Sequence, residues 1–202
     1  MKWKISTYLI CVLFVVGFIA CGGESDDEPD TQQPAKPAAP TDGGEVLQIT
    51  VDYPVEEAAI QEVFTLHAEG IGTKDPDQFM PYWLKSESED VFVAWDFWAG
   101  AFEKHLGWKA IKKGWEGIFR LRSGNMSVEF DSIAIDKIGK NATLYGSYRW
   151  AVSGGFIASM VKDRKEGWKI EQVDYTNKKF GKQVDELKDP AYVNPPPDAE
   201  EE

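Results

Sequence analysis

The sequence predicts an α+β domain in which helices cover one face of a curved antiparallel sheet. Two patterns predict it. Apolar residues recur with helical spacing in the first part of residues 46–180, and they alternate with polar residues in the second part. We therefore expect helix, helix, strand and helix, followed by four consecutive strands. This order along the chain is typical of layered α+β domains.

Three helices are expected from their starting residues and apolar spacing. The first begins near Pro54, a residue that is favoured in the first turn, and glycines near position 70 should end it. An aspartate, Asp75 or Asp77, should cap a short second helix that reaches Leu84. The third spans 108–122, because its apolar residues fall on a single helical face.

The expected strands are separated by glycines and by one change of phase. Residues 91–95 form the first strand, and a loop is expected over 96–107. In the next strand the alternation slips by one residue near Asp131, which indicates a β-bulge. A tight turn is expected at 153–155, and the remaining strands cover 142–152, 156–163 and 168–176. Both faces of 142–152 carry aromatic residues, so the pattern leaves open which face is inner.

The net charge of -12 is carried mainly by the flanks of the domain. Residues 46–180 contain 20 acidic and 17 basic residues, so the domain itself is nearly balanced. Proteins that bind nucleic acid need a basic patch to neutralise phosphates, and this balance argues against such a partner. His67 and His105 have no third ligand at a metal-motif spacing, so no metal and no cofactor is expected.

The N-terminus has the features of a secretory signal peptide. Lys2 and Lys4 precede an apolar run from Tyr8 to Ala20, which is too short to cross a bilayer comfortably. Small residues before Cys21, followed by glycine, resemble the cleavage box of bacterial lipoproteins. The resemblance implies lipidation of Cys21 and attachment to the cell envelope. Because Gly22 follows rather than aspartate, it points to the outer membrane, facing the periplasm or the cell exterior.

Composition divides the chain into four parts. Residues 1–20 are the signal peptide, and 21–45 are the lipidated cysteine with an acidic, proline-rich tether. The domain covers 46–180, and 181–202 is expected to be a solvated acidic tail that is rich in proline. The tether lacks side chains that could form a core, so it should be flexible and should hold the domain clear of the lipid.

Three motifs, in this order, resemble the SnoaL-like branch of the nuclear transport factor two-like superfamily. They are HAEGIGTKDPDQFMPYW from His67, GWKAIKKGWEGIF from Gly107 and EGWKIEQVDYT from Glu166. The resemblance covers residues 55–178. It implies a cystatin-like, cone-shaped fold, with the sheet wrapped around the first helix and an apolar pocket at one end. Its members include isomerases, cyclases and dehydratases, so the fold alone does not select an activity.

Two residues are candidates for proton-transfer chemistry. His67 precedes Asp75 by eight residues, the spacing at which ketosteroid isomerases place a catalytic tyrosine before a Gly-Asp pair. Asp96 follows the first strand, near the position of their general base. A histidine and a carboxylate can together move a proton between substrate atoms. The alternatives are a packed core histidine and a surface carboxylate.

Seven further residues are candidates for lining a ligand pocket. Trp115 and Phe119 should line or back it, and Trp95 and Trp98 should lie at its mouth. Three polar residues of the last strands are expected to form its floor: Tyr145, Arg149 and Asp174. The alternative places Arg149 and Asp174 as a cross-strand pair on the outer face of the sheet.

Three functions stay open at this point. The first is the binding of a small apolar molecule in the aromatic-lined pocket by a domain that a lipid anchors to the membrane. The second is an enzyme of the isomerase, cyclase or dehydratase type, using His67 and Asp96. The third is an envelope scaffold that forms a homodimer through the outer sheet face, where Tyr148 and Trp150 are candidate contacts.

Overall fold

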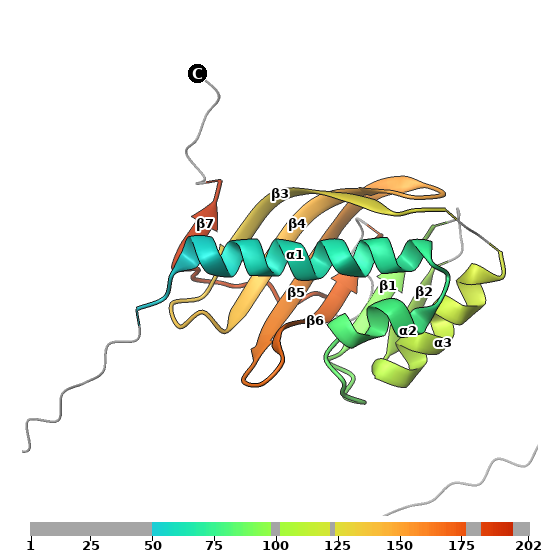
Figure 1. Ribbon diagram of the computed structural model, residues 1–202, viewed down its shortest axis with the longest axis horizontal. Helices are drawn as coiled ribbons and strands as arrows, with labels where there is room; N and C mark the ends of the chain where they lie inside the picture. The colour runs from blue at the N-terminus through green and yellow to red at the C-terminus, as the bar shows by residue number, and fades with distance from the viewer. Residues whose placement is uncertain (1–49, 98–101, 122–123, 177–182, 196–202) are drawn as a thin grey trace, which may run out of the picture. The chain divides into compact units, whose positions relative to one another are not determined.

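The computed structural model describes residues 50–97, 102–121, 124–176 and 183–195, all in the second of two compact units, Val46–Glu202. Its elements are α1 (Tyr53–Gly72), α2 (Pro76–Phe79), η1 (Met80–Tyr82), β1 (Phe92–Trp95), β2 (Glu103–Leu106), α3 (Trp108–Phe119), β3 (Ser127–Ile135), β4 (Asn141–Arg149), β5 (Ser153–Asp163), β6 (Gly167–Asp174) and β7 (Tyr192–Asn194). The predicted α+β class is confirmed (Figure 1). No helix in these ranges is both long and apolar enough to cross a membrane.

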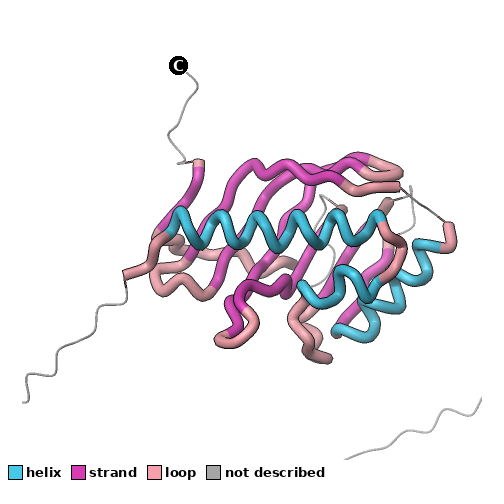
Figure 2. Tube along the Cα trace, viewed as in Figure 1, coloured by secondary structure: helices cyan, strands magenta, loops and turns pink. Residues whose placement is uncertain are grey.

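The strands form one curved sheet in the order β2-β1-β6-β5-β4-β3-β7 (Figure 2). The predicted antiparallel meander is confirmed for β3 to β6. The sheet is mixed, however, because β1 pairs with β6 in parallel. The predicted β-bulge is also confirmed, since the pairing of β3 with β4 shifts between Phe130 and Ser132. A bulge at this point strengthens the bend of the sheet toward α1.

Helix α1 fixes which face of the sheet is inner. The carboxylate of Asp52 caps its first turn by accepting a hydrogen bond from the amide of Val55. Along its apolar stripe, Phe64 is fully buried and stacks on Phe156 of β5, with 4.6 Å between ring centroids. Figure 1 shows α1 crossing the face of β3 to β6, with α2 and α3 near its C-terminal end. Leu144 and its alternate neighbours on β4 therefore face inward.

Gly70 lies inside α1 and does not end it. The helix continues to Gly72, and α2 then folds back against it. A Cβ atom on Gly70 would lie 2.7 Å from the Cβ of Phe79, a separation that real side chains do not reach. The expected end of the helix at a glycine is confirmed for Gly72, its last residue, but not for Gly70. The role of Gly70 is instead to let α1 and α2 approach closely, a constraint that helical spacing does not reveal.

Two strand boundaries also differ from expectation. The expected loop at 96–107 contains β2, whose Glu103–Leu106 pairs antiparallel with β1. Four residues without alternation give no local strand pattern, and the partner strand supplies the hydrogen bonds. The expected turn at Ser153 is the start of β5, and the chain reverses instead at 150–152, where the amide of Trp150 donates to the carbonyl of Val152.

Residues 183–195 pack against the domain, contrary to the expected solvated tail. Strand β7 pairs with β3 and extends the sheet. The ring of Tyr192 stacks on Tyr53 with centroids 5.2 Å apart, and its hydroxyl donates to the carboxylate of Glu57. Asn194 donates to the same carboxylate. The proline and acidic residues of this segment predicted a solvated tail, but Tyr192 and the pairing of β7 attach it to the domain.

The segment before β7 lies on the outer face of the sheet. The side chain of Gln172 on β6 exchanges two hydrogen bonds with Asp185, one from its own amide group and one from the Asp185 backbone. Farther along, the backbone amide of Leu187 donates to the hydroxyl of Thr143 on β4. Gln172 is fully buried as a result. Residues 183–187 thus cover part of the face that the scaffold hypothesis assigned to a dimer contact.

Alanine substitutions at two helical glycines should change stability in opposite directions. Gly117→Ala in α3 meets no atom within 4 Å. It should raise the free energy of unfolding by about 0.5–1 kcal/mol, because alanine restricts the unfolded chain. Gly70→Ala should lower it by about 1–3 kcal/mol, because its Cβ forces α1 and α2 apart. Urea unfolding of the two variants and the wild type measures both changes. Equal effects at the two sites would contradict the proposed close approach.

Candidate ligand-binding site

His67 lies in the interior of the domain, on the apolar stripe of α1. Its side chain is fully buried, and its Nε2 lies 3.2 Å from the hydroxyl oxygen of Tyr175, which follows β6. Aromatic rings meet it edge-on from four residues: Phe64, Phe79, Trp83 and Trp115. The inward direction predicted for His67 is therefore what the structure shows. Its aromatic surroundings come from α1, α2, η1, α3 and the end of β6.

Burial keeps this pair of side chains uncharged. Desolvation lowers the pKa of His67 from 6.5 to about 3, because the imidazolium form would lose its hydration without gaining a counter-charge. Burial also raises the pKa of Tyr175 well above its ordinary value, with a smaller contribution from Tyr148. At neutral pH the site thus presents a neutral imidazole and a phenol. One ring nitrogen of a neutral imidazole donates and the other accepts.

Three indoles extend the site around His67. Trp83, Trp95 and Trp115 are at most 2 % exposed. The centroid distance is 5.6 Å from His67 to Trp83 and 4.9 Å from Trp95 to Trp115. The ring of His67 also lies 6.3 Å from Trp115, so the four rings are connected through close contacts. We call His67, Trp83, Trp95 and Trp115 the indole cluster.

The indole cluster contains four buried nitrogen atoms that have no hydrogen-bond partner among the described residues. They are Nδ1 of His67 and Nε1 of Trp83, Trp95 and Trp115. Three other tryptophans behave differently, since Trp108, Trp150 and Trp168 each donate to an oxygen. A buried polar group without a partner costs about 1–3 kcal/mol and is rare in native proteins. Four such atoms in one cluster indicate a place where a ligand or water supplies the missing partners.

The predicted pocket residues around α3 belong to this interior or border it. Trp95 and Trp115 are members of the indole cluster, and both are fully buried, so Trp95 lies deeper than the mouth position expected for it. Phe119 is half-buried and contacts Trp115 and Phe79 edge-on or tilted. Trp98 lies outside the described residues. Trp83 was not among the candidates, although it ends the first of the three motifs.

Asp96 lies where β1 ends and is partly exposed. Burial and, to a smaller extent, the negative charge of Asp96 together raise the pKa of Tyr148 to about 12. The hydroxyl of Tyr148 in turn donates to the backbone carbonyl of Tyr175 at 3.4 Å. The charge of Asp96 thus acts on the hydroxyl of Tyr148. The role of Asp96 as a catalytic partner of His67 stays a prediction.

The predicted polar floor lies on the outer face of the sheet. The hydroxyl of Tyr145 donates to Glu186 in the covering segment, and burial followed by this contact raises its pKa. Asp174 accepts from the amide and hydroxyl of Thr176 at 2.8 and 2.6 Å. Arg149 is exposed at the end of β4. Arg149 and Asp174 are not cross-strand neighbours, because β5 lies between β4 and β6.

The two candidate dimer contacts, Tyr148 and Trp150, pack against other aromatic rings of the domain, and no group of possible metal ligands is found near them among the described residues. Tyr148 is 5 % exposed and contacts Tyr175, and Trp150 packs against Phe97 and Trp115, so neither ring forms an outer aromatic patch. Within the described ranges, no three His, Cys, Asp or Glu side chains are placed to hold a metal ion.

Several solved structures resemble this one at low identity. A nuclear transport factor 2-like superfamily protein from Salmonella enterica serovar Typhimurium shares 15 % identity over 62 % of this chain and 92 % of its own, with a TM-score of 0.49. An NTF-2 like protein of unknown function from Shewanella oneidensis shares 15 % identity over 60 % of this chain and 97 % of its own, with a TM-score of 0.47. A domain of unknown function with a cystatin-like fold from Nostoc punctiforme shares 17 % identity over 65 % of this chain and 81 % of its own, with a TM-score of 0.48. No family model and no curated protein matches the chain.

The burial of neutral His67 should make the domain less stable in acid. Below pH 6.5 the unfolded chain binds a proton at this residue, whereas the folded state does so only near pH 3. The free energy of unfolding should therefore fall by up to about 1.4 kcal/mol per pH unit as the pH drops through this window. His67→Gln should remove that component of the slope in urea unfolding series.

A matched control is His105→Gln, which leaves His67 in place and should keep its contribution. The imidazole Cε1–H resonance of His67 in the folded protein should also show no titration between pH 7 and pH 5. A midpoint near the ordinary histidine value would contradict the desolvation of the His67 imidazole.

Proposed function

We propose that the domain binds a small, flat, uncharged molecule that carries hydrogen-bond acceptors, and that it binds it in the indole cluster. The observation that carries the proposal is the set of buried nitrogens on His67 and three tryptophans that have no partner among the described residues. An indole Nε1–H can only donate, so its missing partner has to be an acceptor. Carbonyl or ether oxygens on a ligand would supply such acceptors.

The surroundings of the cluster define the shape and charge of the ligand. Its walls are aromatic faces and edges, which favour planar molecules through stacking and edge contacts. The groups inside are neutral at pH 7, since burial disfavours the charged forms of His67 and Tyr175. A charged ligand would lose its hydration without gaining a counter-charge there. An uncharged aromatic carbonyl compound meets both conditions.

Binding in this interior requires side chains to move. The rings of Trp95 and Trp115 are in contact at 4.9 Å, which leaves no space for another ring between them. The half-buried ring of Phe119 borders the cluster and can turn outward at lower cost than a buried one. A ligand would therefore enter by opening the cluster, and part of its binding energy would offset this rearrangement.

Ligand binding is better supported than proton transfer at His67. A general base works best when its pKa lies near the operating pH, and the pKa of His67 is about 3. At neutral pH such an imidazole is a weak base but still a good hydrogen-bond partner. The enzyme alternative with His67 and Asp96 requires a substrate that raises this pKa strongly on binding.

Substitution of one indole should separate donation from apolar contact. We expect 2-acetonaphthone to shift the indole N–H resonances of Trp83, Trp95 and Trp115 but not that of Trp168, which already donates to Glu56 at 2.8 Å. Naphthalene, which lacks an acceptor, should bind about tenfold more weakly. Trp115→Phe should weaken 2-acetonaphthone binding by about five- to tenfold, and the matched variant Trp168→Phe should not change it. Unshifted cluster resonances at saturating probe would overturn the proposal.

We also propose that a lipid on Cys21 anchors the domain to the bacterial cell envelope, at the outer membrane. The support is sequence-based: two lysines, an apolar run from Tyr8 to Ala20, and small residues around the cysteine. Residues 1–49 lie outside the described part of the chain. Two or three acyl chains would suffice for stable attachment, since each buried CH₂ contributes about 0.8 kcal/mol.

The Cys21→Ser variant tests this anchor. It removes the acyl-accepting thiol about 30 residues before α1, in the segment whose composition predicts a flexible tether. Wild type should incorporate labelled palmitate and partition into detergent, and the variant should do neither. The thermal unfolding midpoints of the two proteins should agree. A variant that remains with membranes after a high-salt wash would show that another segment or partner provides the attachment.

A further inference from the structure

The outer face of β3, β4 and β5 carries a small polar lattice near the C-terminal end of β4. One row across the strands is Ser127, Arg149 and Ser153. The next row is Glu129, Ser147 and Gly155. The two long charged side chains therefore stand at diagonal positions, and small residues occupy the positions between them. This arrangement leaves an open space bounded by a cation on one side and an anion on the other.

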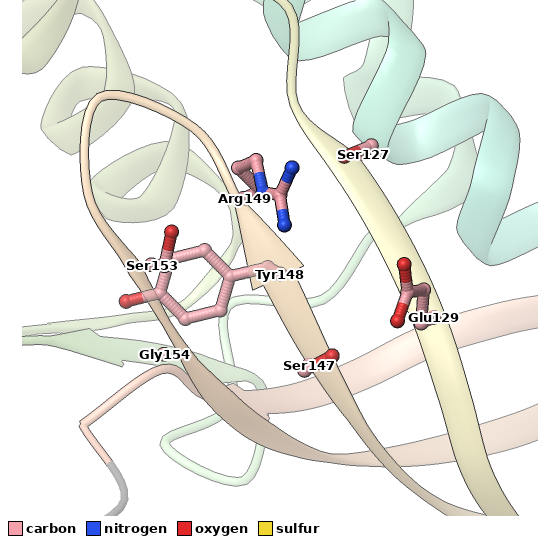
Figure 3. Close-up of a pocket in the computed structure, with 7 residues that line it drawn as sticks. All are labelled: Ser127, Glu129, Ser147, Tyr148, Arg149, Ser153 and Gly154. Carbon is pink, nitrogen blue, oxygen red and sulfur yellow. The ribbon is translucent and has the colours of Figure 1, made fainter.

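The structure shows a pocket at this lattice with a volume of about 330 Å³. Figure 3 shows Arg149 and Glu129 extending from neighbouring strands, with Ser127 and Ser147 beside them. Gly154 and Tyr148 complete the lining. The volume lies near the lower end of the range for small-molecule sites, which is about 300–1,000 Å³. The pocket is therefore suited to a small molecule.

Arg149 and Glu129 form no ion pair with each other and no side-chain hydrogen bond within the described parts of the chain. Diagonal cross-strand neighbours have Cα atoms about 7–8 Å apart, a separation that long side chains can span, but these two side chains do not meet. A ligand that bears both charges could contact the two of them at once. The serine hydroxyls can donate to its anionic group or accept from its cationic group.

We propose that this pocket binds the zwitterionic head of a free α-amino acid. The guanidinium of Arg149 binds the carboxylate with two parallel hydrogen bonds, and the carboxylate of Glu129 binds the ammonium group. Each charged residue also disfavours a ligand that carries only one charge, of the same sign as its own. Glu129 repels a simple anion, and Arg149 repels a simple cation. Because both side chains are exposed, solvent screening keeps the affinity weak, with a dissociation constant of about a millimolar or more.

This site uses residues other than those of the proposed indole cluster. Its charged residues, Glu129 and Arg149, lie on the outer face, whereas the indoles lie against the inner face. Tyr148, which lines the pocket, contacts Tyr175 beside His67. The two sites differ in chemistry as well, because one offers neutral donors in a buried interior and the other offers opposite charges beside water. Loss of one activity would therefore leave the other intact, and Trp115→Phe should not affect amino-acid binding.

L-alanine is the probe for the test, titrated into the labelled chain and followed by amide resonances. It should shift the amides of Ser127, Glu129, Ser147, Arg149 and Ser153 with a millimolar midpoint. Propionate and ethylamine each match one half of the zwitterion and should bind about tenfold more weakly. Arg149→Gln and Glu129→Gln should each weaken L-alanine binding by about tenfold or more, whereas Arg164→Gln in the β5–β6 turn should not.

Arg149→Lys adds a readout that does not depend on net charge. It keeps the cation but loses the bidentate geometry, so it should weaken L-alanine binding while leaving the far-ultraviolet circular dichroism unchanged. Equal affinity for propionate and L-alanine would show a simple anion site and overturn the proposal. Resonances that do not shift at about 50 mM L-alanine, well above the millimolar affinity expected of exposed charges, would also overturn it.

Discussion

The packing of α1 on the inner face of the curved sheet is the contact on which the other features depend. Phe64 stacks on Phe156 and meets Phe130 edge-on, which fixes the rotation of the helix about its own axis. His67 lies one turn farther along the same stripe and is carried into the interior as a result. Close approach at Gly70 then brings α2 and η1, and with them Trp83, against the histidine. A rotation of α1 by one residue would turn His67 away from Trp83 and Trp115.

The features that sequence predicted well are those in which local pattern and tertiary environment agree. Helical spacing placed His67 inside, Asp75 was expected as a cap and accepts from the amide of Asp77, and the slip in alternation located the bulge. Strand β2 was missed because its partner, rather than its own composition, makes it a strand. The docking of Tyr192 was missed for a similar reason, since proline and acidic neighbours outweigh a single aromatic residue in any composition-based reading.

Some residues of the candidate site were likewise predicted from the local sequence pattern, and others were not. Trp95 and Trp115 were identified because aromatic residues near a predicted helix face commonly line an interior. Trp83 was not, because it follows a 3₁₀ turn that has no amphipathic period of its own. The inner face of β4 could not be selected from sequence, since aromatic residues occur on both of its faces. Only the position of α1 decides this, and it sends Tyr145 and Arg149 outward. Alternation identifies the residues that share a face, but packing decides which face is covered.

The stack of Tyr53 on Tyr192 has a consequence for the connectivity of the domain. It joins the first turn of α1 to the last strand, so the start of α1 and β7 lie together at one corner of the described domain (Figure 1). The two ends of the described domain therefore lie close together in space. A short covalent bridge between them would close the chain into a ring, and a new opening could be made in an exposed turn such as 164–166 without separating any pair of strands.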